Sequence, residues 1–421
     1  MQKKLLILGG KPIGSCEIVE YAKSKGIYTV VADYLPKEQS AAKRIADECW
    51  EISTADLCAL KSAIKEEGIT GIYTGVHEFN IEKMIELCED INYPCFCTLE
   101  QWRTLNNKKA FKELCRHFDV PVTKEFSLEH FTGEDIDKYP VIVKPVDGSG
   151  SRGFSICSNQ SELKKAYNQA LNFSDSKKVL IEKYMNYKNS VIINYTLVNG
   201  KIYFNGISDK QSKKVFKNGA PIMAVQFYSS VYEKEYLEKL NEKVKKMFLD
   251  YGLRNGVIWI EAFCDKGEFT FNEMGFRFGG SLTYLPVQHL YGVDQLGLQI
   301  EYALEGKYKE NYILTEERRK EAEKYYCILP IHVRTGKIKS IAGIDELRQK
   351  RFVLKIVPVH FVEDQIENWG SAQQVFAYIH IVGNSKEDIE KYIDEILSVI
   401  SVKDYNGEEM LFNLYKEKIH K

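Results

Sequence analysis

The stretch that decides the fold is a predicted β-hairpin, Val257-Ile-Trp-Ile-Glu-Ala-Phe263 followed by Glu268-Phe-Thr-Phe-Asn-Glu-Met-Gly-Phe-Arg-Phe-Gly-Gly280. Asp265-Lys-Gly267 is the predicted turn between its strands. Side chains alternate across a strand, so residues 257, 259, 261 and 263 should share one face, and residues 269, 271 and 273 one face of the partner strand. Glu261 and Glu273 are therefore expected to point the same way.

Two carboxylates placed side by side repel each other and are poorly hydrated among Trp259, Phe269 and Phe271, unless a cation joins them. Mg²⁺ is the hard cation that suits such oxygen ligands. Arg277 follows closely and suits a phosphate or a carboxylate. The alternative for this segment is a solvent-facing hairpin edge with ordinary charges.

Length and charge restrict the class of protein. A chain of 421 residues suggests about three domains, at roughly 150 residues each. The 58 basic and 59 acidic side chains give a net charge of −1, which argues against a nucleic-acid partner. The apolar run after Met1 is too short for a signal peptide, and no apolar span reaches the ~18 residues of a membrane helix. We expect a cytoplasmic protein without a membrane partner.

The 10 cysteines are scattered along the chain, and Cys157, Cys264 and Cys327 lie inside apolar stretches. They are expected to be reduced core thiols, which agrees with a cytoplasmic location. Cys95-Phe-Cys97 is the only close pair and lacks a second pair at zinc-site spacing. A metal or redox role for this pair is the alternative.

The first hundred residues predict a parallel sheet. Apolar runs at residues 5–8, 28–32 and 72–74 and the helical spacing of Ile81, Met84 and Ile85 indicate a βαβ pattern. Gly9-Gly-Lys-Pro-Ile-Gly14 lacks the G-x-G-x-x-G spacing of a dinucleotide site, and its proline removes an amide. A structural turn that opens a helix is therefore favoured over a bound dinucleotide.

A second glycine-rich segment, Lys144-Pro-Val-Asp-Gly-Ser-Gly-Ser-Arg-Gly-Phe154, does satisfy that spacing. The next helix begins only at Asn159-Gln-Ser-Glu162, which resembles a capping box, so the loop should join two strands. Such a hairpin can present backbone amides to phosphates as a flap, and Lys144 could reach the same phosphates. A mobile surface hairpin is the alternative.

The rest of the chain mixes helices and strands. We predict a strand at residues 179–185, a hairpin turned at Asn199-Gly200, and a helix over residues 237–251. Beyond residue 310 we predict a charged helix at 315–324, a hairpin over 328–341 and a last helix over 386–401. The fold class is therefore α/β and α+β.

These motifs, in this order along the chain, resemble the ATP-grasp superfamily in its carboxylate-amine ligase and biotin carboxylase-like branch. The resemblance implies a Rossmann-like N-terminal domain at residues 1–103, a two-lobed ATP-grasp domain at 104–310 and a small C-terminal α+β domain at 311–421. It also implies ATP and Mg²⁺ (or Mn²⁺) as cofactors.

The resemblance assigns roles to individual positions, which fall into four groups. The phosphate-binding positions are Lys108, Lys144, Gly148, Ser149, Gly150, Ser151 and Gly153. The adenine hinge, acting largely through backbone groups, is Glu182, Lys183, Tyr184 and Met185. The metal ligands are Glu261 and Glu273. The catalytic positions are Lys210 near the γ-phosphate, with Lys213 and Lys214 as competitors, and Arg277 on the acyl phosphate.

Two positions depart from the family pattern. Asn189 stands where members often have a glutamate for the ribose hydroxyls, which puts ribose binding there in doubt. Gly275 stands where many members have an asparagine, two residues after the second metal glutamate. A two-metal site would then lack one side-chain ligand.

The resemblance implies an ADP-forming ligase that activates a small carboxylate as an acyl phosphate and joins it to an amine. The expected partners are these small molecules, and the oligomeric state is left open, with a homodimer as one option. The alternatives are a biotin carboxylase-like enzyme that uses bicarbonate and an ATP-binding regulatory module without catalysis.

Overall fold

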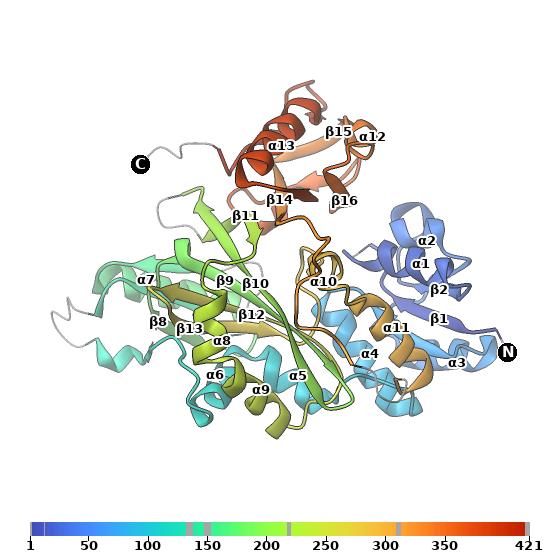
Figure 1. Cartoon of the computed structure of the whole chain (residues 1–421), viewed down its shortest axis with the longest axis horizontal. Coiled ribbons are helices and arrows are strands. Elements are labelled where there is room, and N and C mark those ends of the chain that lie inside the picture. Colours follow the sequence, from blue (N-terminus) through green and yellow to red (C-terminus); the bar gives the residue numbers. More distant parts are fainter. Residues whose placement is uncertain are drawn as a thin grey trace.

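The computed structural model of the chain describes residues 2–11, 13–131, 138–146, 153–216, 220–308 and 313–416. Its class is mixed α/β, a parallel sheet followed by antiparallel sheets, which confirms the predicted fold class (Figure 1). Within these residues, no helix is both long and apolar enough to cross a membrane. All ten cysteines lie in the described part of the chain and are free thiols.

The N-terminal sheet is parallel and has the strand order β3-β2-β1-β4. Strand β2 spans the five residues predicted for it. The central strands are nearly continuous apolar runs, as expected for a sheet that helices cover. The elements of this part are β1 (Lys4–Leu8), α1 (Ser15–Ser24), β2 (Tyr28–Ala32), α2 (Ala41–Ile45), β3 (Glu48–Trp50), α3 (Leu57–Glu67), β4 (Gly71–Thr74) and α4 (Glu78–Ile91).

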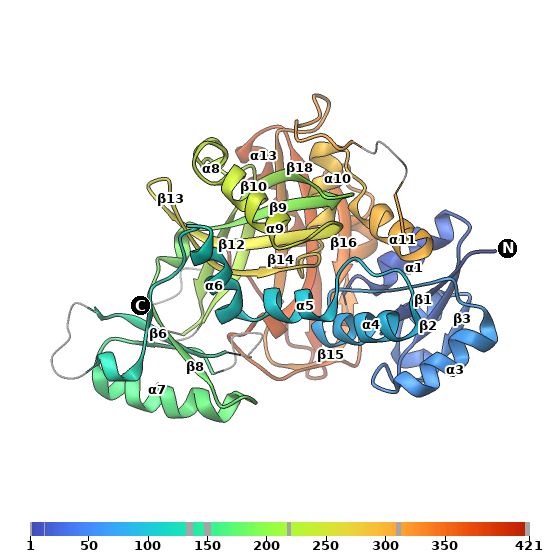
Figure 2. The ribbon, with the colours of Figure 1, turned by 90° about the horizontal axis from the view of Figure 1, so that it is seen from below.

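A second sheet, of order β5-β8-β6-β7, forms a small lobe with α7, and Figure 2 shows this lobe at the opposite end from the N-terminal sheet. Val141 on β6 pairs with Cys157 on β7, so the glycine loop joins two strands, as predicted. The Asn159 side chain accepts a hydrogen bond from the Glu162 N–H, which confirms the predicted cap. The elements are α5 (Leu99–Asn106), α6 (Lys108–His117), β5 (Glu125–Phe126), β6 (Val141–Pro145), β7 (Ser155–Cys157), α7 (Gln160–Phe173) and β8 (Val179–Lys183).

A nine-stranded sheet lies between these two parts, in the order β13-β12-β9-β10-β11-β14-β18-β16, with β20 beside β14. The hairpin predicted at Asn199-Gly200 is present. The helix predicted over 237–251 is broken at Leu240, where the following Asn241 side chain accepts a hydrogen bond from the Tyr195 hydroxyl at 3.0 Å. The elements are β9 (Ser190–Val198), β10 (Lys201–Lys214), β11 (Pro221–Tyr228), α8 (Glu233–Lys239), α9 (Asn241–Asp250), β12 (Gly256–Asp265), β13 (Glu268–Gly275), α10 (Tyr284–Tyr291) and α11 (Gln295–Glu305).

The large sheet continues beyond residue 310, because β11 pairs with β14, with Gln226 opposite Ile328. The boundaries of the three domains stay a prediction. The C-terminal elements are β14 (Tyr325–Val333), β15 (Gly336–Ala342), α12 (Ile344–Leu347), β16 (Val353–Pro358), β17 (Gln365–Ile366), β18 (Val375–Gly383), α13 (Lys386–Val399), β19 (Ser401–Asp404) and β20 (Leu411–Phe412).

Two sequence predictions in this region are wrong. Strands β14 and β15 exist but do not form a hairpin, because β15 pairs with β17 and β19 and buries Ile338 in one core with Val402 and Ile393. Residues 315–324 are irregular rather than helical. The Arg319 N–H bonds to the Leu290 carbonyl oxygen at 2.7 Å, and a charged stretch without an apolar stripe has no helix face to bury.

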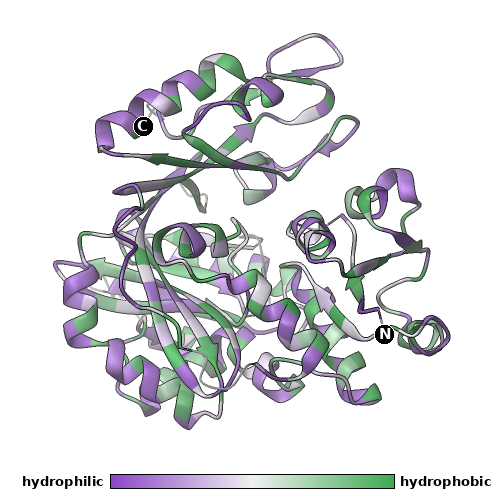
Figure 3. Ribbon diagram, turned by 45° about the vertical axis from the view of Figure 1, so that its right-hand side comes forward, coloured by the Kyte–Doolittle hydropathy of each residue, from purple (hydrophilic) through white to green (hydrophobic). Residues whose placement is uncertain are grey.

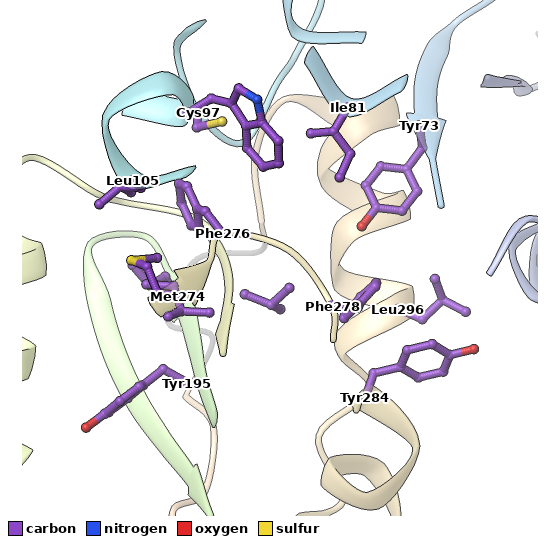
Figure 4. Close-up of a cluster of buried hydrophobic side chains, with 14 of the residues drawn as sticks. Tyr73, Ile81, Cys97, Leu105, Tyr195, Met274, Phe276, Phe278, Tyr284 and Leu296 are labelled. Atoms are coloured by element: carbon purple, nitrogen blue, oxygen red, sulfur yellow. The ribbon is translucent and has the colours of Figure 1, made fainter. Parts of the chain in front are cut away.

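The main core joins the N-terminal sheet to the large sheet. Figure 3 shows hydrophobic residues along the central strands, while the helices carry hydrophobic and hydrophilic faces. Phe276 and Phe278 lie in this core with Tyr284, as Figure 4 shows. Both phenylalanines are buried, Phe276 against Phe96 at 5.1 Å and Phe278 against Tyr284 at 4.9 Å between ring centroids. They anchor the backbone on either side of residue 277.

Candidate active site

The predicted carboxylate pair is present. Glu261 on β12 lies directly opposite Glu273 on β13. The register shifts beside this pair, because Ala262 is opposite Phe271 and Asn272 is an extra residue. Such a bulge redirects the extra side chain. The Asn272 side chain donates from Nδ2 to Glu261 Oε1 at 3.1 Å, so it lies on the side of the carboxylates.

Phe271 lies on the opposite face of β13 from Glu273, which contradicts the alternation predicted for residues 269, 271 and 273. Phe271 pairs with Ala262, whose side chain alternates with that of Glu261. It is fully buried in the main core. The prediction that the two carboxylates share a face is nevertheless confirmed, because the bulge falls between Phe271 and Glu273.

These side chains line a cavity of about 740 Å³. Its walls come from the large sheet, the small lobe and helices α4, α5 and α6, and its size suits a small-molecule site. The predicted site residues that line it are Lys108, Lys144, Tyr184, Met185, Lys210, Glu261, Glu273 and Arg277. Four further predicted residues, Gly148, Ser149, Gly150 and Ser151, lie outside the described part of the chain.

Lysines surround the two carboxylates. Lys108 Nζ lies 3.6 Å from Glu273 Oε2, and Lys210 forms an ion pair with Glu261. Lys144 reaches the same face from β6 and lines the same cavity. The structure thus brings together three lysines and two glutamates from distant parts of the chain.

The charge of Glu273 is stabilised by this arrangement. Burial raises its pKa, but the positive charges of Lys108, Lys144, Lys210 and Arg277 outweigh burial and hold the pKa of Glu273 below its ordinary value. Glu273 is therefore ionised at neutral pH.

The three candidate lysines near the end of β10 have different surroundings. Lys210 pairs with Glu261 and lines the cavity. Lys213 donates to the carbonyl oxygen of Tyr415, near the C-terminus. Lys214 lies over the Tyr184 ring, 5.3 Å from its centroid. Of these three, Lys210 alone lines the cavity, and its place near the γ-phosphate stays a prediction.

Glu182 has a partner that sequence reasoning missed. Its side chain is only 2 % exposed and lies between Lys144, 2.7 Å away, and the fully buried Lys112. Burial raises the pKa of Glu182, but the two lysines lower it to about 2. Lys112 could have been noticed from its sequence, because it falls in the buried stripe of α6 with Phe111 and Cys115. The Glu182 carboxylate thus holds Lys144 rather than facing the cavity.

The other predicted hinge residues differ in whether they line the cavity. Tyr184 and Met185 line the cavity. The Lys183 ammonium bonds to the Lys138 carbonyl oxygen at 3.2 Å, outside that lining. The Tyr184 N–H bonds to the Pro140 carbonyl oxygen at 3.1 Å, so this amide is already used by the small lobe. Adenine recognition by the hinge stays a prediction.

Gly153 is the described part of the predicted flap. Its φ is +70°, and a Cβ there would lie 2.9 Å from Pro145 Cγ and 3.0 Å from Phe173 Cβ, so a side chain would be strained. The neighbouring Phe154 lines the cavity. The side chain of Asn189, the doubtful ribose ligand, lies outside what the structure describes.

Arg277 lines the cavity and is held from two sides. Its Nη2 donates to Glu78 Oε1 at 2.7 Å, and its Nη1 donates to the Phe278 carbonyl oxygen at 2.9 Å. Its guanidinium lies 5.4 Å from the Trp259 ring centroid, and its Nε is buried without a hydrogen-bond partner among the described residues. Sequence reasoning did not single out Glu78, which is 199 positions away from Arg277.

Side chains of the N-terminal region occupy the space around the glycine turn that follows β1. The Gly10 N–H donates to Asp33 Oδ2 at 2.7 Å, and Asp33 Oδ1 pairs with the buried Lys43 at 3.0 Å. A Cβ at Gly10 would lie 2.0 Å from Ser40 Oγ. These contacts occupy the carboxylate that a dinucleotide ribose would need, and they agree with the structural-turn interpretation.

Comparison with known proteins gives a consistent family. Residues 137–284 match the model of the ATP-grasp domain. The chain is 24% identical over 286 residues to formate-dependent phosphoribosylglycinamide formyltransferase of Sulfurisphaera tokodaii. The matched region covers 65% of this chain and 70% of that protein.

Solved structures share the fold over nearly the whole chain. L-amino acid ligase from Bacillus licheniformis has a TM-score of 0.77 at 18% identity, covering 96% of this chain and 99% of that one. The biotin carboxylase domain of the Hydrogenobacter thermophilus 2-oxoglutarate carboxylase, solved with MgADP, ADP and bicarbonate, also has a TM-score of 0.77, at 19% identity, covering 97% and 91%. This chain therefore carries an ATP-grasp domain at residues 137–284, and it shares its fold with these solved structures over nearly its whole length.

Proposed function

We propose that this chain is a cytoplasmic, ADP-forming ligase that activates a small carboxylate with ATP and joins it to an amine. The observation that carries the proposal is the pairing of Glu261 with Glu273 in a cavity that also holds Lys108, Lys144 and Lys210. Paired carboxylates suit a divalent cation, and clustered lysines suit the phosphates that such a cation accompanies.

Magnesium or manganese fits the residues present. Glu261 and Glu273 offer hard oxygen ligands on one face, and the pKa of Glu273 is held below its ordinary value by the surrounding positive charges after the opposing effect of burial. When bound, the ion neutralises phosphate charge and helps to orient the γ-phosphoryl group. The H. thermophilus domain, solved with MgADP, supports this choice of nucleotide and metal.

Different residues of the cavity would contact different parts of ATP. Tyr184 and Met185 would contact adenine from the hinge. The Tyr184 N–H would not take part, because it is bonded to the Pro140 carbonyl oxygen. Lys108, Lys144 and Lys210 would offset the negative charge of the triphosphate.

Arg277 is the proposed contact for the acyl substrate. A carboxylate oxygen attacks the γ-phosphorus and ADP leaves, which gives an acyl phosphate. An amine then attacks the acyl carbon, loses a proton, and releases phosphate. Arg277 can hold the carboxylate and then the acyl phosphate, since its Nε has no hydrogen-bond partner among the described residues. The buried Phe276 and Phe278 fix its position.

The names of relatives support a small carboxylate substrate. One relative is formate-dependent, and one shared fold belongs to an L-amino acid ligase. A bicarbonate-using carboxylase is the second candidate, because the H. thermophilus domain was solved with bicarbonate. A homodimer stays a proposal that sedimentation of the purified chain would test.

The experiment is a screen of the purified chain with ATP, Mg²⁺ and paired small carboxylates and amines, with nucleotides separated by chromatography. ADP release that needs a carboxylate and an amine supports the proposal. Hydroxylamine in place of the amine should give a hydroxamate, less in Arg277→Ala than in Arg348→Ala, which changes an exposed arginine. AMP as the main product contradicts the proposal, bicarbonate-dependent ADP favours the carboxylase, and Mg-ATP binding without turnover favours a regulatory module.

A further inference from the structure

Position 275 cannot supply a side-chain ligand beside the two carboxylates. Gly275 lies directly opposite Trp259, whose indole occupies the adjacent space. A Cβ on residue 275 would lie 2.3 Å from Trp259 Nε1 and 2.6 Å from Cε2, closer than such atoms can approach. The guanidinium of Arg277 also packs against this ring, at 5.4 Å from its centroid.

Asn272 lies beside the two carboxylates. It is the extra residue of the bulge opposite Glu261, and without the bulge its side chain would alternate to the other face. Its Nδ2 is 3.1 Å from Glu261 Oε1, and its Oδ1 is 3.4 Å from Lys144 Nζ. The amide oxygen therefore faces the lysine that we assign to the phosphates.

We propose that Asn272 is a ligand of the divalent cation, through its amide oxygen, and that the bulge compensates for the missing side chain at position 275. This inference rests on the proposed function, because it takes the cation to be the one that accompanies the nucleotide. An amide oxygen is a hard, neutral ligand, so it adds coordination to Glu261 and Glu273 without a third negative charge.

Asn272 could instead act only as a hydrogen-bond donor that positions Glu261. The two roles differ in what replaces the side chain. When a ligand is removed, a water molecule takes its place on the ion, whereas loss of a donor leaves the number of bound waters unchanged. Aspartate keeps an oxygen ligand but cannot donate, so Asn272→Asp separates the two roles as well.

The experiment measures Mn²⁺ binding to the full chain in the presence of ADP by electron paramagnetic resonance, and counts Mn²⁺-bound waters by deuterium modulation in heavy water. In Asn272→Ala we expect Mn²⁺ affinity to fall by about tenfold or more, with a gain of about one water in place of the lost ligand. Asn272→Asp should retain Mn²⁺ binding. Asn384→Ala, which removes the same amide from an exposed position, should match wild type.

Wild-type Mn²⁺ affinity in Asn272→Ala would overturn the inference and leave the proposed function standing. Weaker binding without an added water, or equal losses in Asn272→Ala and Asn272→Asp, would also overturn it, because Asn272 would then only position Glu261. If the wild-type chain bound no Mn²⁺ with ADP, both the inference and the proposed function would fail. ADP binding measured without metal shows whether each variant still folds.

Discussion

Lys108 and Lys109 are neighbours at the start of α6 but have opposite surroundings. Lys108 Nζ lies 3.6 Å from Glu273 Oε2 inside the cavity, whereas the Lys109 side chain is 60% exposed and lies 3.9 Å from Glu113 on the outer surface. Substituting each lysine in turn therefore distinguishes a charge contact inside the cavity from a general effect of the protein's net charge.

Lys108→Ala should weaken ATP binding by about tenfold, because a charge-assisted contact to a phosphate is lost. Lys109→Ala should bind ATP as wild type does. Isothermal titration with a non-hydrolysable ATP analogue and Mg²⁺ gives both dissociation constants. Equal affinities for the two variants would remove Lys108 from the phosphate site.

Glu273→Gln should lower ATP turnover by about a hundredfold or more, because glutamine keeps the shape of the side chain but loses the charge that a divalent cation requires. Glu268→Gln is the matched control, since Glu268 lies on the same strand and is 80% exposed beside Lys239. Steady-state ADP release measures both. Turnover in Glu273→Gln equal to that of the control would exclude a metal-ligand role.

Glu182→Gln should lower the free energy of unfolding by about 3 kcal/mol at neutral pH, because the buried Lys112 would keep only Glu125, 3.9 Å away, as a charged partner. Glu129→Gln, an exposed change in the same lobe, should stay within about 0.5 kcal/mol of wild type. Urea unfolding followed by circular dichroism gives these values.

The same pair predicts a pH dependence. Burial raises the pKa of Glu182, but Lys144 and Lys112 outweigh it and bring the folded-state pKa to about 2, below the ordinary value of 4.5. The ion pair therefore stabilises the fold fully above pH 4.5, and this contribution is lost as the pH falls toward 2. The difference between wild type and Glu182→Gln should shrink over that window. A difference that stays constant down to the acid transition would contradict the pairing.

Gly275→Ala should destabilise the chain by about 1–3 kcal/mol, because the added methyl group would collide with the Trp259 indole. Gly280→Ala is the control, since a Cβ at Gly280 would meet nothing within 4 Å. The measurement is the midpoint of thermal unfolding of wild type, Gly275→Ala and Gly280→Ala. A wild-type midpoint for Gly275→Ala would mean that the indole can move away, and the cation site would then have room at position 275.

Much of the fold could be predicted from short-range pattern. Strand β2 is a continuous apolar run, and the turn at residues 265–267 joins β12 and β13 where glycine and a polar residue suggested it. The partners of β15 could not be predicted, because they depend on which core buries Ile338 and not on the nearby turn.

The candidate site also combines residues that could be predicted from the sequence with residues that could not. Glu261 and Glu273 could be found because both lie on one hairpin, where alternation and a short turn restrict the geometry. Asn272 could not, because an alternating pattern does not reveal a single inserted residue. The contact of Lys112 with Glu182 spans 70 positions and depends on how α6 packs against the small lobe. The buried stripe of α6 marks Lys112, but no periodic signal in the sequence marks Glu182 as its partner.

The formation of an acyl phosphate is tested most directly by isotope transfer. The purified chain is given ATP, Mg²⁺, an amine and a carboxylate labelled with ¹⁸O, using a pair that supports ADP release, and the phosphate is analysed by mass spectrometry. We predict that each phosphate released with ADP carries one ¹⁸O atom, because a carboxylate oxygen attacks the γ-phosphorus and leaves with it. Unlabelled phosphate, or AMP with pyrophosphate as the products, would contradict this account.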